Sequence, residues 1–136
     1  MNPTYLLDTN ICIYIRQRRP ARVLARFKAL EAGAAALSVI TFGELLYGVM
    51  KSPERKSSEA KLRELMSLLA VLPLPEKAAD TYGEIRAELA AKGTPIGNND
   101  LWIAAHAKAS GLILVTNNER EFKRVKGLKV QNWAKA

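Results

Sequence analysis

The apolar stretches of this chain are short, and segments with helical spacing of apolar residues separate them. β-Strands are predicted over residues 4–7, 35–40, 71–74 and 112–115, with a further short strand over 128–133. Helices are predicted over residues 11–16, 20–32, 41–51, 54–69, 76–92, 100–110 and 119–122. Neighbouring parallel strands need a crossover connection, which is usually a helix. The alternation therefore predicts an α/β fold with a mostly parallel sheet covered on both faces.

Length and composition favour one compact unit. The chain has 136 residues, of which 49% are hydrophobic, and it contains no repeat or linker-like tract. That length supports one hydrophobic core and leaves little room for a second. We therefore predict a single domain over residues 1–136. Pro73 interrupts the predicted strand 71–74, so that strand is expected at an edge of the sheet or in an irregular position.

Charge and cysteine content narrow the function classes. Twenty-one Lys and Arg residues against thirteen Asp and Glu give a net charge of +8, which favours nucleic acid or an acidic protein surface as partner. A merely basic soluble protein is the alternative. Cys12 is the only cysteine, which excludes an intramolecular disulfide and a cysteine-based zinc site. No apolar run approaches the roughly 18 residues of a membrane span, so we expect a cytoplasmic protein.

Four acidic residues share one setting: Asp8, Glu44, Asp100 and Glu121 each lie at or just past the start of a predicted helix. Asp8 and Glu44 come after predicted strands, and Glu121 follows another strand after a short loop. In open α/β sheets, sites form beyond the carboxyl ends of the strands. We therefore expect these carboxylates to gather at one edge of the sheet.

Helix capping explains each acid singly. Residues 41–44 match a capping box, and residues 118–121 resemble one with Asn in the capping position. Capping does not require the helices to start on the same side of a sheet, whereas a metal site does. Mg²⁺ prefers oxygen ligands and is commonly shared between carboxylates and substrate phosphates. Without a cation, converging carboxylates would repel one another and a polyanion.

Four segments resemble the four motifs of PIN-domain ribonucleases, in the same order and across nearly the whole chain. They are YLLDTN (5–10), TFGELLYG (41–48), PIGNND (95–100) with IAAHA (103–107), and VTNN (115–118) with Glu121 and Phe122. The chain is most similar to VapC-like toxins of bacterial VapBC toxin–antitoxin systems. The resemblance implies a PIN fold, with three α/β/α layers and a central sheet of four to five strands.

The resemblance also implies a reaction, the hydrolysis of RNA phosphodiesters by a Mg²⁺- or Mn²⁺-dependent endoribonuclease that leaves 5′-phosphate and 3′-hydroxyl ends. Asp8 and Asp100 correspond to the main metal ligands, and Glu44 binds the metal directly or through water. Many PIN domains carry an acid directly after the Thr of the fourth motif, where this chain has Asn117. Glu121 is therefore taken as the fourth acid, orienting water or a second ion.

Residues around the predicted site are candidates for contacts with RNA. The polar candidates are Thr9, Asn10, Thr116 and Asn117, and the basic ones are Arg16, Arg19 and Lys51. The basic side chains would neutralise phosphates and make affinity depend on salt, although a solvated helix face explains each one equally well. The family cuts structured loops of transfer or ribosomal RNA, and these residues do not select between the two.

Partners also follow from the resemblance. It implies a cognate VapB-like antitoxin, a homodimer and a toxin–antitoxin hetero-oligomer, with no membrane contact. The antitoxin would cover the acidic site and apolar grooves beside it. Candidate groove residues are Leu45, Leu46 and Val49, together with residues 62–69.

Competing functions make different demands on the sequence. His106 is the only histidine, so a metal-free ribonuclease with two histidines is excluded, and His106 is expected to be a packing or surface residue. A phosphoacceptor receiver domain would need an acid next to Asp8, which the chain lacks. Cys12 is expected to be buried and inert. Trp102 and Trp133 could stack on bases, but core packing is the expectation for both. The remaining rival is a non-catalytic RNA- or protein-binding module, which would be indifferent to metal.

Overall fold

A parallel β-sheet forms the centre of the protein in the computed structural model, which describes residues 2–135. Its five strands lie in the order β3-β2-β1-β4-β5 and all pair in parallel. They are β1 (Tyr5–Leu7), β2 (Ala35–Ser38), β3 (Ala70–Leu72), β4 (Ile113–Val115) and β5 (Val130–Gln131). The predicted fold class is confirmed, including the edge position of the strand that precedes Pro73.

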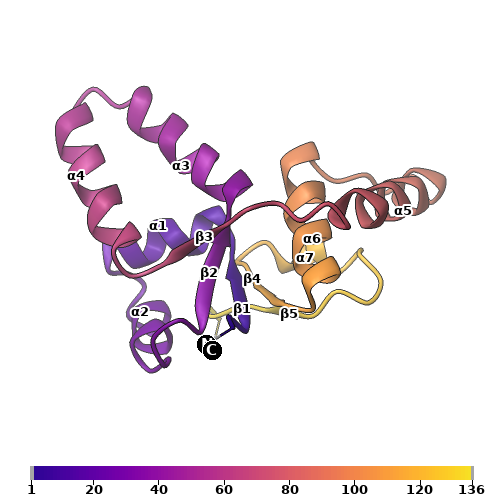
Figure 1. The fold of residues 1–136 in the computed structure, drawn as a ribbon, viewed down its shortest axis with the longest axis horizontal. Helices are drawn as coiled ribbons and strands as arrows, with labels where there is room; N and C mark the ends of the chain where they lie inside the picture. The colour runs from indigo at the N-terminus through magenta and orange to yellow at the C-terminus, as the bar shows by residue number, and fades with distance from the viewer. Residues whose placement is uncertain (1, 136) are drawn as a thin grey trace.

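Helices cover both faces of the sheet, which gives three α/β/α layers (Figure 1). One face packs against α1–α4 and the other against α5–α7. The helices are α1 (Thr9–Gln17), α2 (Ala21–Lys28), α3 (Val39–Met50), α4 (Arg55–Met66), α5 (Ala78–Ala91), α6 (Asn98–Ser110) and α7 (Glu119–Phe122).

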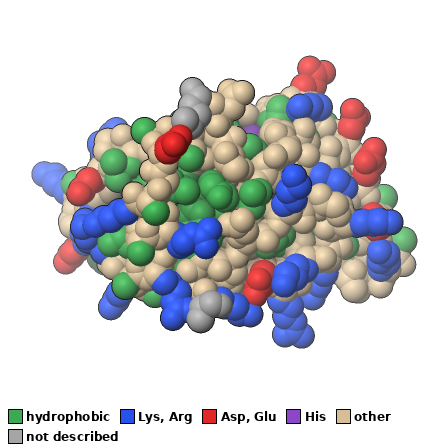
Figure 2. Space-filling view, turned by 90° about the horizontal axis from the view of Figure 1, so that it is seen from below, with side chains coloured by type: hydrophobic (Ala, Val, Ile, Leu, Met, Phe, Trp, Pro, Cys, Tyr) green, Lys and Arg blue, Asp and Glu red, His purple; other side chains and the backbone are tan. Residues whose placement is uncertain are grey.

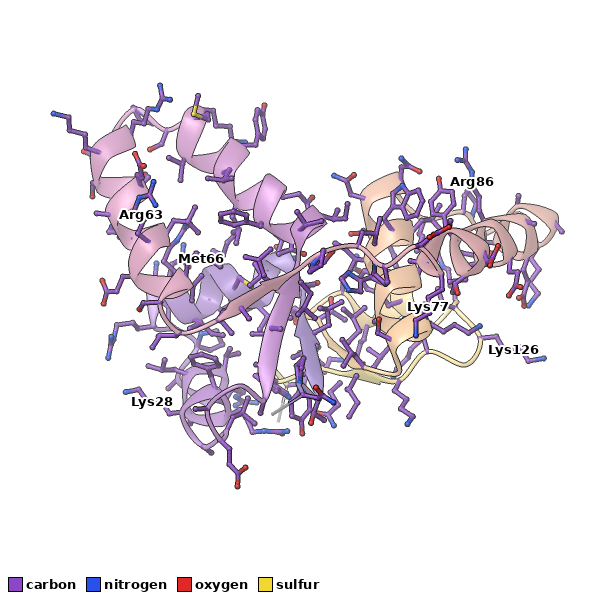
Figure 3. The ribbon with its side chains drawn as sticks, in the orientation of Figure 1. Lys28, Arg63, Met66, Lys77, Arg86 and Lys126 are labelled. Carbon is purple, nitrogen blue, oxygen red and sulfur yellow. The ribbon has the colours of Figure 1, made fainter. Side chains whose placement is uncertain are left out.

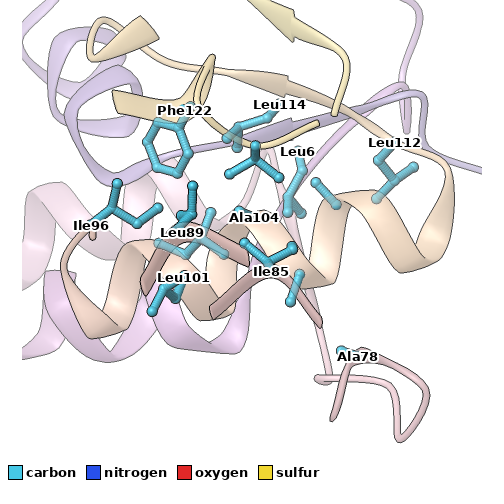
Figure 4. Close-up of a cluster of buried hydrophobic side chains, with 14 residues drawn as sticks. Leu6, Ala78, Ile85, Leu89, Ile96, Leu101, Ala104, Leu112, Leu114 and Phe122 are labelled. Atoms are coloured by element: carbon cyan, nitrogen blue, oxygen red, sulfur yellow. The ribbon is translucent and has the colours of Figure 1, made fainter. Parts of the chain in front are cut away.

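Alternation along the central strands supplies both hydrophobic cores. Leu6 on β1 pairs in register with Leu114 on β4, and both are buried on the face covered by α5, α6 and α7 (Figure 4). Leu7 and Val115 follow them in register and are buried on the opposite face. Successive side chains of a strand point to opposite faces, so three-residue strands are long enough to serve both layers.

The boundary between β2 and α3 differs from the predicted one. The strand was predicted to run to Ile40, but it ends at Ser38, and α3 already begins at Val39. The Ser38 side chain accepts a hydrogen bond from the Ile40 N–H at 3.2 Å, which satisfies one of the free amides at the start of the helix. The β-branched residues Val39 and Ile40 therefore belong to the first helical turn, despite their preference for strands.

Three other boundaries shift for local reasons. α1 starts at Thr9 because Asp8 is its cap, whereas Thr9 and Asn10 had been predicted to cap it. α6 starts two residues earlier than predicted, at Asn98. β5 spans only two residues, and Trp133 beyond it is buried in the core with its ring edge on Tyr5.

The surface retains the basic character of the composition. Lys and Arg side chains project all round the face seen from below (Figure 2). Among residues 2–135, none of the helices combines the length and the apolar character needed to cross a membrane.

Truncating a central core residue tests this packing. Leu114 is 0% exposed, so Leu114→Ala should lower the free energy of unfolding by about 2–5 kcal/mol. Leu68→Ala is the matched control, because Leu68 is 60% exposed and its truncation should change stability by about 0.5 kcal/mol or less. Urea denaturation measures both changes, and equal losses in the two variants would contradict the described core.

Candidate active site

Asp8 is fixed between the two central strands at the carboxyl edge of the sheet. It follows β1 directly, its backbone N–H donates to the Val115 carbonyl at 3.0 Å, and its side chain is 5% exposed. Its Oδ1 accepts from the Ile11 N–H at 3.1 Å, and its Oδ2 accepts from the Thr116 hydroxyl. Asp8 therefore caps α1, as the capping explanation predicts, and is also held at the sheet edge by β4.

Glu44 lies on α3 and is oriented by a residue of α1. The Thr9 hydroxyl donates to Glu44 Oε1 at 2.6 Å, and the side chain is half-buried. The predicted capping box of residues 41–44 is wrong, because Ser38 caps α3 and Thr41 lies inside the helix. The buried Thr41 hydroxyl finds no hydrogen-bond partner within the described chain. Capping therefore does not explain why an acid occupies position 44.

Asp100 and Glu121 reach the site from the other layer of helices. Asp100 is half-buried in the first turn of α6, and Glu121 is half-buried on α7. The predicted Asn118 cap of α7 is also wrong, since the Asn118 side chain makes no capping hydrogen bond. Instead, the Asn118 N–H donates to the Thr116 hydroxyl oxygen at 2.9 Å.

Electrostatics show that the four carboxylates form one cluster, which we call the acidic cluster: Asp8, Glu44, Asp100 and Glu121. Burial raises the pKa of Asp8 to about 6, against the lowering effect of its hydrogen bonds, and the negative charges of Asp100 and Glu44 add to the rise. Burial likewise raises the pKa of Asp100 to about 6, helped by Glu121 and Glu44. Perturbed pKa values that arise from burial and like charges are typical of functional sites.

The donor set of the acidic cluster fits a hard divalent cation. It contains only carboxylate oxygens, which suit Mg²⁺ or Mn²⁺. Within residues 2–135, no three His, Cys, Asp or Glu side chains are placed to enclose a metal ion by themselves. Mg²⁺ does not require such an enclosure, because it commonly binds through one or two carboxylates and keeps waters and substrate phosphates as its other ligands.

The other nucleophilic and basic groups lie outside the cluster. His106 is buried on α6, where its Nδ1 lies 2.9 Å from Ser38 Oγ, and burial lowers its pKa. Cys12 is buried, and burial raises the pKa of its thiol, so it is inert as predicted. The Ser38–His106 contact was missed in the sequence, although a Ser at the start of a helix is itself a capping signal. The contact ties the start of α3 to α6, the two helices that carry Glu44 and Asp100.

The threonines predicted to contact substrate bond to the acids of the cluster. Thr9 holds Glu44, and Thr116 holds Asp8. The Asn117 amide donates to the Tyr14 hydroxyl at 2.9 Å and accepts from Asn132 at 3.2 Å.

The remaining predicted contacts surround the cluster at greater distance. Asn10 is exposed in the first turn of α1. Arg16 lies eight residues after Asp8 and Lys51 seven after Glu44, so the helical rise puts each backbone about 10–12 Å along its helix from the acid. Arg19 is exposed just past α1, and Lys51 Nζ lies 5.0 Å from the Tyr47 ring centroid.

Known proteins match this chain in sequence and in fold. The sequence profile of the PIN domain matches residues 5–128. Ribonuclease VapC2 of Haemophilus influenzae is 47% identical over 129 residues, which are 95% of this chain and 97% of the relative. The chain belongs to the VapC ribonucleases of the PIN-domain family. The tRNA(fMet)-specific endonuclease VapC of Shigella flexneri is 45% identical, covering 96% of this chain and 98% of that protein.

A solved VapC structure has the same fold. In the crystal structure of VapBC2 from Rickettsia felis bound to a promoter DNA fragment, one chain superposes with a TM-score of 0.89 at 43% identity. The match covers 95% of this chain and 98% of that one. VapC proteins are nucleases, and PIN-domain nucleases generally use a divalent metal, so the composition of the acidic cluster agrees with the family's chemistry.

The raised pKa values predict how stability depends on pH. Folded Asp8 and Asp100 have pKa values of about 6, against an ordinary value of 3.8. Between pH 4 and 6 the folded protein therefore binds more protons than the unfolded chain. The free energy of unfolding should consequently fall as pH rises through this window and stay lower above it. Asp8→Asn should make this fall shallower and stabilise the metal-free protein at pH 7. The gain should be up to about 3 kcal/mol, the free-energy equivalent of raising the Asp8 pKa from 3.8 to about 6.

Chemical denaturation in chelator from pH 4 to 8 measures this dependence. Asp80→Asn is the matched control, because Asp80 is exposed on α5, and it should leave the profile unchanged. An Asp8→Asn protein that is no more stable than the wild type at pH 7 would contradict the electrostatic cost of the acidic cluster.

Proposed function

We propose that this chain is a toxin endoribonuclease that hydrolyses phosphodiester bonds in structured RNA with Mg²⁺ or Mn²⁺ at the acidic cluster. The observation that carries the proposal is the meeting of four carboxylates from separate elements. Burial and the negative charges of neighbouring carboxylates raise the pKa values of Asp8 and Asp100. In the absence of a cation this arrangement costs stability. A function that needs a cation accounts for that cost.

Each acid has a role that its surroundings support. Asp8 and Asp100 would hold the cation, Glu44 would bind it directly or through water, and Glu121 would orient water. A divalent cation bound there would polarise the phosphate and lower the pKa of a water molecule. The Thr116 hydroxyl lowers the pKa of Asp8 and so favours the ionised form that binds a cation. The Thr9 hydroxyl fixes the direction of the Glu44 carboxylate.

Transfer RNA is the substrate class we favour. The Shigella flexneri relative is named a tRNA(fMet)-specific endonuclease, and a Salmonella typhimurium relative at 43% identity carries the same name. The net charge of +8 supports an RNA substrate. Asn10, Asn117, Arg16, Arg19 and Lys51 are the proposed contacts to its backbone.

A cognate VapB-like antitoxin and a second copy of the chain are the proposed protein partners. The Rickettsia felis match comes from a VapBC complex. Two apolar hollows support an antitoxin, one of about 680 Å³ between α1, α2 and α4 and one of about 300 Å³ between α3 and α4. Leu46 and Leu68 are exposed beside them, whereas the predicted groove residues Leu45 and Val49 belong to the core.

A non-catalytic binding module remains the rival function. It accounts for the basic charge, but it supplies no reason to gather four carboxylates beside an RNA surface. The two functions differ in their response to metal and to loss of a single carboxylate.

Cleavage of purified tRNA separates the two functions. The wild type should cut tRNA with Mg²⁺ or Mn²⁺ and stop in chelator. Asp8→Asn and Asp100→Asn should each lower the rate by about 100-fold or more, since each removes a charged group from the site of transition-state stabilisation. Asp80→Asn should cut at the wild-type rate. Metal-independent cleavage, or full activity in both site variants, would refute the proposal, and mapping the ends identifies the bond that is cut.

Antitoxin binding makes a separate prediction. Leu46→Asp and Leu68→Asp place charges on the exposed apolar rims of the two hollows and should weaken co-purification with the cognate antitoxin by about tenfold or more. Both variants should keep wild-type tRNA cleavage, because neither residue belongs to the acidic cluster. Undiminished co-purification of both would place the antitoxin elsewhere. Sedimentation of the isolated chain tests for the homodimer.

A further inference from the structure

A second group of side chains with recognition chemistry lies on the surface between α5 and α6. We call it the α5–α6 patch: Tyr82, Arg86, Asn98 and Trp102. The Tyr82 and Trp102 rings are stacked, with centroids 3.9 Å apart and planes at 15°. Arg86 Nη1 donates to the Tyr82 hydroxyl oxygen at 2.7 Å, and the Tyr82 hydroxyl donates to Asn98 Oδ1. Figure 3 shows Arg86 extending from α5 beside α6.

The patch adds to a core that other residues form, and Tyr82 packs against that core. The core shared by the two helices includes Ile85, Leu89 and Leu101, which are 2–4% exposed. Tyr82 and Trp102 are only half-buried, and Arg86 and Asn98 are exposed. Large aromatic rings that keep part of their surface in water, next to an arginine, are typical of recognition surfaces.

A hollow of about 340 Å³ adjoins the patch. Leu89, Ile96 and Leu101 supply apolar walls, while Arg86 and Asn98 also line it. An apolar floor with a few polar groups is the usual composition of a site for a small flat ligand group. The guanidinium of Arg86 stacks on planar groups and donates hydrogen bonds, and the Asn98 amide both donates and accepts.

The patch and the acidic cluster share the first turns of α6. Asn98 and Trp102 lie two residues before and two residues after Asp100. Residues two apart on a helix point about 200° apart, so the patch lies across α6 from Asp100, about one helix diameter of 10 Å away. RNA bound at the acidic cluster and crossing the start of α6 would bring a neighbouring base to the patch.

We propose that the α5–α6 patch binds a nucleobase of the RNA substrate, next to the bond that is cut. This inference rests on the proposed function. The aromatic pair and Arg86 offer stacking surfaces, and Arg86 and Asn98 offer hydrogen bonds to the base edge. Proteins read unstacked bases of RNA loops in this way.

Tryptophan fluorescence tests the proposal without cleavage. In chelator, the wild type is titrated with 12-nucleotide single-stranded oligomers of A, C or U and with an abasic oligomer of equal charge. Trp133 is 2% exposed, so quenching by bases should come from Trp102. At least one base-bearing oligomer should quench the signal while the abasic oligomer does not. Trp133→Phe should keep the quenching, and Trp102→Phe should abolish it.

Affinity changes in exposed variants test the other contacts without disturbing the fold. Arg86→Ala should weaken binding of the quenching oligomer by about 5- to 100-fold, the range for loss of one stacking contact. Arg63→Ala is the matched control, because it removes the same charge from the exposed surface of α4, and it should weaken binding much less. Asn98→Ala should reduce the differences in affinity between the A, C and U oligomers.

Three results would overturn the inference: equal quenching by the abasic oligomer, wild-type binding by Arg86→Ala, or loss of antitoxin binding by Arg86→Ala with RNA quenching unchanged. The last would make the patch a protein contact. If wild-type protein cuts tRNA in the presence of metal, any of these results rejects the base site alone. If it cuts no tRNA, the proposed function fails independently.

Discussion

The parallel pairing of β1 between β2 and β4 is the constraint on which the rest of the structure depends. It places Asp8 directly beside Thr116 at one edge of the sheet, and it sends α1, α3 and the segment leading to α7 away from that edge. Because every strand is parallel, each helical connection between successive strands returns the chain to the opposite edge of the sheet. The carboxylates of α3 and α6 therefore reach Asp8 from both sides, although more than thirty residues separate successive members in all but one case.

The acidic cluster carries an electrostatic cost that comes mainly from burial, and at Asp8 hydrogen bonds offset part of it. Asp8 accepts from an amide and a hydroxyl, yet desolvation and two neighbouring carboxylates still raise its pKa to about 6. Thr9 and Thr116 are more than polar neighbours, because each fixes one acid from a different element. His106 adds a link between α3 and α6 through Ser38. The acidic cluster is thus preorganised by uncharged side chains, which leave its net negative charge available to a cation.

Much of the fold could be predicted because its signals are local. The apolar stretches and amphipathic segments located nearly every element, and Pro73 correctly indicated an edge strand. Boundaries were less predictable, since Val39 and Ile40 favour strands but lie in α3 once Ser38 caps it. The capping box at 41–44 failed because α3 already begins after Ser38, which leaves Thr41 inside the helix. At 118–121 the helix does begin after Asn118, but the Asn118 side chain makes no capping hydrogen bond.

The sequence by itself determined which acids are present, the order of strands and helices around them, and the resemblance that identified their family. It could also exclude a ribonuclease with two catalytic histidines and a cysteine-based zinc site, since both depend only on counting residues. Only the tertiary structure decided that Thr9 and Thr116 hold carboxylates, that Asn117 bonds to Tyr14, and that Trp102 stacks on Tyr82 while Trp133 is buried. These partners lie far apart in the chain. Their pairing follows from strand register and helix packing, which no local pattern of residues encodes.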